Sequence, residues 1–183
     1  MFLLEVEPLD LGPDVRAIGV ELVEAGEERE PVRGREAAII WARVISAVAG
    51  EDTWGLDFFN LARVRDFCEQ HHVSFREESG RLIVIPSPKA DTLAAIFERF
   101  QGETFGARAG GLFNQGDPGL EAELARRGID AYHSAFPNYA FCAVCEFEEG
   151  SIVLLSERLW ANEVIRRVRP ALEGLDVEVF LPA

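Results

Sequence analysis

Sulfur and imidazole side chains are the groups in this sequence best suited to metal or redox chemistry. Cys142 and Cys145 form a C-x-x-C pair, and Cys68 and His72 are separated by four residues. Spacing by four can place two ligands on one helical face, and a tetrahedral zinc site needs four ligands of these types. However, the C-x-x-C pair falls in a predicted strand, where residues three apart point to opposite faces. We therefore expect core cysteines, no metal and no cofactor, with a structural zinc as the alternative.

His133 lies in an irregular segment with Asp130 and Ser134 close by in sequence. Serine, histidine and aspartate can form a catalytic triad, but the triad depends on a spatial geometry that adjacency in sequence does not supply. The sequence also lacks the G-x-S-x-G turn that presents a nucleophilic serine. Two interpretations stay open: His133 is an acid–base catalyst, or it is a loop histidine that caps backbone groups. We prefer the second.

A glycine-rich segment precedes the histidine and suggests where a ligand would bind. Gly106–Gly119 contains five glycines, which let the backbone approach a ligand closely. The segment Tyr132–Tyr139 then supplies aromatic rings, the apolar area that ligand pockets need. If a ligand site exists, we expect it where these two segments meet, while the alternative is that the rings fill the core. The candidate ligand-binding residues are Asn114, Gln115, Tyr132, His133, Phe136 and Tyr139.

Carboxylates spaced by two residues occur in three predicted strands, so the members of each pair share one face of a sheet. Such pairs can bind a divalent cation or act as acid and base. Their alternation with apolar residues favours a simpler interpretation, in which they form the solvent-exposed faces of half-buried strands. The pairs are Glu5 and Glu7, Glu146 and Glu148, and Asp176 and Glu178.

Charge and composition exclude several classes of protein. The 183 residues are 48% hydrophobic and 27% charged, which is typical of a globular chain, and the net charge is −14. Nucleic-acid binding depends on basic side chains that neutralise phosphates, so direct binding to DNA, RNA or an anionic membrane is disfavoured. No signal peptide or spanning segment is recognisable, and three cysteines do not suggest export. We expect a reduced, cytoplasmic protein.

Periodicity predicts a chain of alternating helices and strands. Apolar stripes predict helices over 36–49, from Leu61 to His71, from Leu93 to Phe100, over 118–127 and from Trp160 to Leu172. Ser87 and Pro88 offer a cap and a first helical residue for the third helix, and Pro170 is expected to kink or end the last one near Arg169. Strands are predicted at 3–7, 15–23, 53–58, 74–78, 81–86, 103–107, 139–148, 151–156 and 176–181. Leu82–Ile85 and Ile152–Leu155 are apolar on both faces, as in central strands. The charged segment Ala25–Arg35 is expected to be a mobile loop.

The predicted elements repeat in the order hairpin, helix, strand. The fold class that follows is α+β, with a mostly antiparallel sheet built from two or three repeated ββαβ units and helices packed mainly on one face. We expect one globular domain over 1–183, and an internal repeat would divide it at 1–59, 60–110 and 111–183. Chance resemblance between acidic hairpins is the alternative to duplication.

These features favour a non-catalytic cytoplasmic protein with an acidic surface that binds a protein partner or a small ligand. The first alternative is a small enzyme with a cleft between repeats, in which His133 acts as acid or base. The second is an acidic mimic of nucleic acid, which requires carboxylates spaced like phosphates. A homo-oligomer is compatible with each of these functions.

Overall fold

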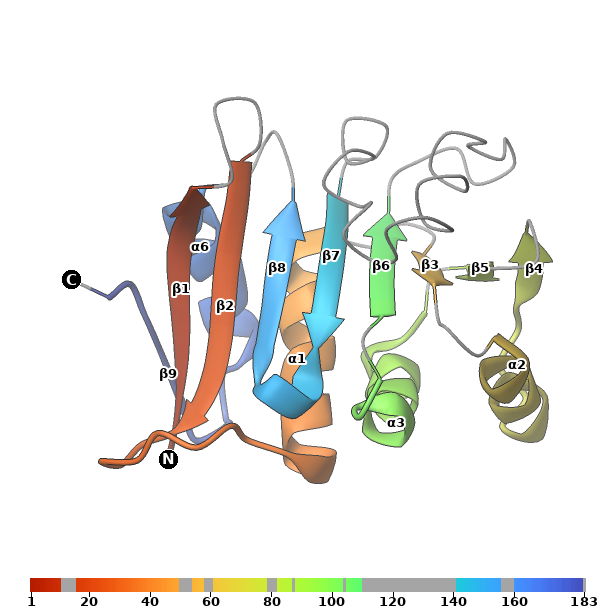
Figure 1. The fold of residues 1–183 in the computed structure, drawn as a ribbon, viewed down its shortest axis with the longest axis horizontal. Helices are drawn as coiled ribbons and strands as arrows, with labels where there is room; N and C mark the ends of the chain where they lie inside the picture. Colours follow the sequence, from red (N-terminus) through yellow and green to blue (C-terminus); the bar gives the residue numbers. More distant parts are fainter. Residues whose placement is uncertain are drawn as a thin grey trace.

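The computed structural model describes residues 1–10, 16–49, 54–57, 61–78, 82–86, 88–103, 105–109, 141–155 and 160–182. The described chain is a mixed α+β fold in which helices cover a mostly antiparallel sheet (Figure 1). Its helices are α1 (Gly34–Ala49), α2 (Leu61–Gln70), α3 (Ala90–Phe100) and α6 (Ala161–Ala171), with a 3₁₀ turn, η3, at Phe147–Glu149. None of the helices within these ranges is long and apolar enough to cross a membrane.

The described strands form one sheet in the order β4-β5-β3-β6-β7-β8-β2-β1-β9. Neighbouring strands are antiparallel except β1 and β9, which are parallel. The strands are β1 (Phe2–Asp10), β2 (Arg16–Glu24), β3 (Trp54–Asp57), β4 (Arg76–Glu78), β5 (Leu82–Ile85), β6 (Phe105–Ala109), β7 (Phe141–Glu146), β8 (Ser151–Leu155) and β9 (Val177–Phe180). The predicted α+β class and mostly antiparallel sheet are therefore confirmed.

A hairpin, a helix and a strand follow one another three times along the chain: β1–β2–α1–β3, β4–β5–α3–β6 and β7–β8–α6–β9. Within the sheet, however, the three units interleave. One strand separates β5 from β6, two separate β8 from β9, and three separate β2 from β3. The duplication of a ββαβ unit accordingly stays a prediction.

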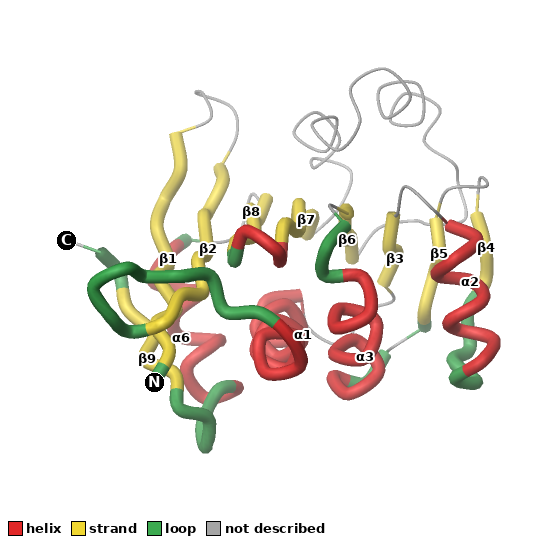
Figure 2. The backbone as a smooth tube through the Cα atoms, turned by 60° about the horizontal axis from the view of Figure 1, so that its bottom comes forward, coloured by secondary structure: helices red, strands yellow, loops and turns green. Residues whose placement is uncertain are grey.

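The helices α1, α3 and α6 lie side by side on one face of the sheet (Figure 2). The sheet contributes alternate residues to the core beneath them, such as Leu4 and Val6 of β1, because side chains of a strand alternate between its faces. Helix α1 is central and contacts both α3 and α6. The amide of Gly34 at its start donates to Oε1 of Gln101 at the end of α3, over 2.8 Å.

An aromatic cluster closes the core between α1, α3 and η3. The ring of Phe147 stacks on Trp41 with centroids 5.4 Å apart. It packs against Phe97 in an edge-to-face arrangement with centroids 4.8 Å apart. All three side chains are buried. The chain differs here from the predicted strand 139–148: β7 ends at Glu146, and a 3₁₀ turn follows at Phe147–Glu149.

Helix ends also differ from those predicted. Helix α3 begins at Ala90 after an extended Lys89, and not at Pro88. Helix α6 includes Pro170 and ends at Ala171, two residues beyond Arg169, near which proline was expected to kink or end it. Proline in the last turn does not remove the hydrogen bonds at the end of the helix, because the amide of Leu172 still donates to carbonyls of that turn.

Candidate functional site

The ligand site predicted from sequence lies outside the described residues. This holds for all six of its members, Asn114, Gln115, Tyr132, His133, Phe136 and Tyr139. The helix predicted over 118–127 lies in the same part of the chain. A ligand site at these residues, and a catalytic role for His133, therefore stay predictions.

Cys68 and Cys145 are buried thiols. Burial raises the pKa of the Cys68 thiol to about 11, and burial, followed by the nearby carboxylate of Glu146, raises the pKa of Cys145. A thiol with a raised pKa stays protonated at neutral pH, so it is a poor nucleophile and a poor metal ligand. His72 lies beyond the end of α2 with a φ of 55°, so helical spacing does not join it to Cys68. Among the described residues, no group of three or more histidine, cysteine or acidic side chains could hold a metal ion.

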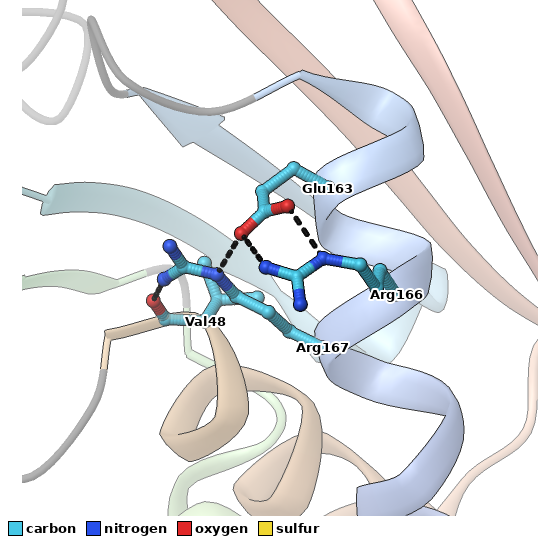
Figure 3. A network of polar contacts seen from close by, with 4 residues as sticks. All are labelled: Val48, Glu163, Arg166 and Arg167. Carbon is cyan, nitrogen blue, oxygen red and sulfur yellow. Dashed lines mark hydrogen bonds and ion pairs between the residues drawn. The ribbon is translucent and has the colours of Figure 1, made fainter.

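Glu163 on α6 is a carboxyl with a strongly lowered pKa, and its contacts are drawn in Figure 3. Hydrogen bonds from Arg166 and then from Arg167 lower the pKa of Glu163 to about 2. Arg167 also donates through Nη1 to the carbonyl of Val48 at the end of α1, over 2.9 Å. In return, Arg43 of α1 donates to the carbonyl of Ala171 at the end of α6. Perturbed carboxyls often mark active sites, but this one belongs to a structural link between two helix ends.

Carboxylates gather instead on the sheet face that faces away from α1 and α6. Glu5 and Glu7 alternate with buried Leu4 and Val6 on β1, so they project from the opposite face. The register places Glu21 of β2 directly opposite Glu5. Glu178 of β9 pairs with Leu3, which alternates to the same side. We call the carboxylates of Glu5, Glu7, Glu21 and Glu178 the acidic face.

One of the other predicted carboxylate pairs does not lie on a strand. Glu148 lies in the 3₁₀ turn rather than in the strand that contains Glu146. Asp176 immediately precedes β9, where its carbonyl accepts a hydrogen bond from the amide of Phe2, and both Asp176 and Glu178 are exposed.

Arg29 reaches the acidic face from the segment that follows β2. Its guanidinium forms an ion pair with Glu5, whose side chain is only 12% exposed. Arg29 has a φ of 47°, a left-handed conformation that non-glycine residues seldom adopt. This contact was not predictable from the sequence, since nothing in the local pattern joins residues 5 and 29.

The segment that carries Arg29, which the sequence predicts to be a mobile loop, makes several hydrogen bonds with neighbouring elements. The amide of Glu24 donates to the carbonyl of Glu30, and the amide of Val32 donates to the carbonyl of Leu22. Farther along, Arg33 donates to the carbonyl of Glu148. These bonds fasten the segment to β2 and to η3.

Comparison of the chain with protein-family models, with curated proteins and with solved structures gave no match.

Proposed function

We propose that the protein is a non-catalytic binding protein whose acidic face holds a basic surface of another protein. The observation that carries this proposal is that Glu7, Glu21 and Glu178 are exposed and project from one face of three neighbouring strands. Exposed charges of one sign that gather on one surface attract a surface of the opposite sign.

The exposure of the carboxylates supports a large partner rather than an internal role. Glu7, Glu21 and Glu178 are exposed, and Arg29 neutralises only the partly buried Glu5. The net charge of −14 adds a long-range attraction for cations. Such complementarity speeds association and selects the partner, and salt weakens it.

Octa-arginine labelled with fluorescein is the first probe for this function, with binding followed by fluorescence anisotropy. The variant combines Glu7→Gln, Glu21→Gln and Glu178→Gln. Exposed ion pairs contribute about 0.5 kcal/mol each, so the loss of three, about 1.5 kcal/mol in all, should weaken binding about tenfold. Raising the salt concentration should weaken binding to the unaltered protein as well.

A matched control variant distinguishes binding by the acidic face from attraction by the net charge of the whole protein. It combines Glu69→Gln, Asp91→Asn and Glu98→Gln, which are exposed positions on α2 and α3. Both triple variants remove the same number of negative charges. If the control weakens binding as much as the acidic-face variant does, net charge alone attracts the probe and the proposal is wrong.

The other functions predicted from the sequence, an enzyme that uses His133 and an acidic mimic of nucleic acid, are not favoured by any described residue. The cytoplasmic location also stays a prediction.

A further inference from the structure

The described sheet ends at β9, the strand at the left of Figure 1. In a parallel pair, alternate residues of a strand direct their N–H and C=O groups toward the neighbour. The amide of Phe2 donates to the carbonyl of Asp176, and Phe2 lies opposite Val177. This pairing directs the N–H and C=O groups of Glu178 toward β1. The N–H and C=O groups of Val177 and Val179 then point outward, away from the sheet.

A hollow of about 530 Å³ lies beside this edge, between β9 and the end of α6. Its apolar lining includes Leu172, Leu175, Val177 and Val179. Leu172 and Val179 are buried, whereas Leu175 and Val177 are partly exposed. The hollow therefore continues the hydrophobic core at the point where the sheet stops.

The residues that line the hollow include both basic and acidic ones. Its cation, Arg169, donates through Nη2 to the outward-facing carbonyl of Val179 over 3.1 Å. The residues Glu173 and Glu178 also line the hollow, and both are exposed. Glu178 also belongs to the acidic face, so the edge of the sheet and that face meet at one residue.

We propose that β9 accepts one more strand, an extended basic segment of the partner protein. This inference rests on the proposed function. A strand paired with β9 places alternate side chains on the side of Val177 and Val179, above the hollow, and the others on the side of Glu178. The segment that matches both sides alternates small apolar residues with arginine or lysine.

A second copy of the chain is the weaker candidate for this edge. Its own β9 reads Val-Glu-Val-Phe, so symmetric pairing of two β9 strands would bring two Glu178 carboxylates near one another. Like charges across a strand pair are unfavourable. Charge complementarity therefore selects a basic segment rather than β9 of another copy.

Three capped peptides of the sequence (Arg-Val)₄ test the added strand on the unaltered protein. One has no modification, one is N-methylated at every arginine, and one at every valine. N-methylation removes a backbone donor, and only one of the two alternating sets can face β9. One methylated peptide should bind about tenfold more weakly than the parent, because its amides can no longer donate to the outward carbonyls of Val177 and Val179. The other should bind within about threefold of the parent.

Amide hydrogen exchange gives a second readout. Binding of the unmodified peptide should slow exchange at the outward amides of Val177 and Val179 more than at Glu178. If both methylated peptides bind as well as the parent, or both fail equally, the added strand is wrong, while the octa-arginine experiment still decides the proposed function. If neither octa-arginine nor the unmodified peptide binds, both proposals are wrong.

Discussion

Phe147 is the side chain on which α1, α3 and η3 meet, through its contacts with Trp41 and Phe97. It is 1% exposed, so Phe147→Ala should leave a cavity that the surrounding rings cannot fill. The expected loss is about 3–5 kcal/mol in the free energy of unfolding, measured by urea titration. Phe67→Ala, at a partly exposed ring on α2, should cost less. Equal losses for the two variants would contradict the central place given to Phe147.

Gly150 occupies a position that only glycine can fill without distortion. Its φ is 69°, and an added Cβ would lie 2.8 Å from the carbonyl oxygen of Leu22 and 2.9 Å from Cβ of Pro31. Gly174 has a φ of 86° but open space around it, so Gly174→Ala measures backbone strain alone, about 1–2 kcal/mol. Gly150→Ala should lower the melting temperature further than Gly174→Ala. Equal shifts in melting temperature would show that the backbone at residues 22 and 31 moves to make room for the added Cβ.

The burial of single residues in and after β7 could be predicted from alternation, but the end of the strand could not. Ala143, Cys145 and Phe147 are spaced by two residues, and all three are buried. Alternation did not predict that Phe147 leaves the strand, because the rings of Trp41 and Phe97 that receive it come from distant helices. The same holds for Arg29, whose partner Glu5 lies on another strand.

Helices α1 and α6 are joined at their ends through the hydrogen bonds of Glu163, Arg167 and Val48. The pKa of Glu163 falls from 4.5 to about 2 when it accepts bonds from Arg166 and Arg167. A carboxyl with a lowered folded-state pKa stabilises the fold above its unfolded pKa, and this contribution is lost as the pH falls. Glu163→Gln should therefore lower the melting temperature at pH 7.

The difference between the unaltered protein and Glu163→Gln should shrink as the pH falls from 4.5 to about 2. Glu98→Gln on α3 is the control for removal of an exposed carboxylate, and we expect it to change the melting temperature little at pH 7. A difference for Glu163→Gln that persists undiminished at pH 2 would mean that its carboxylate does not stabilise the link.

The helices and strands were largely predictable from the sequence, because the residue patterns that indicate them are local. Apolar spacing predicted α1, whose buried face includes Ile40, Trp41, Val44 and Val48. Ends were less predictable: capping signals placed the start of α3 two residues early, and α6 ends two residues beyond Arg169. Ile83 and Leu154, predicted to be central, are buried in strands that have a neighbour on each side.

Across the whole molecule, strand order was beyond the reach of the sequence. Which strands pair depends on contacts between distant segments, such as β2 with β8, and no local pattern encodes them. The acidic face follows from that order, since it brings Glu178 of the last strand beside β1. The predicted alternation of Glu5 and Glu7 indicated one exposed strand, but only the sheet shows which carboxylates join them.

Interleaving of the strands leads to a prediction about fragments of the chain. The fragment 60–110 contains β4, β5, α3 and β6, but β3, which lies between β5 and β6, belongs to the preceding segment. Without β3, the fragment has no backbone partner for the facing edges of those two strands. The fragment should therefore show no cooperative urea transition by circular dichroism, whereas the whole chain should show one. A cooperative transition in the fragment would mean that β5 and β6 can pair directly, which would favour an ancestral unit able to fold alone.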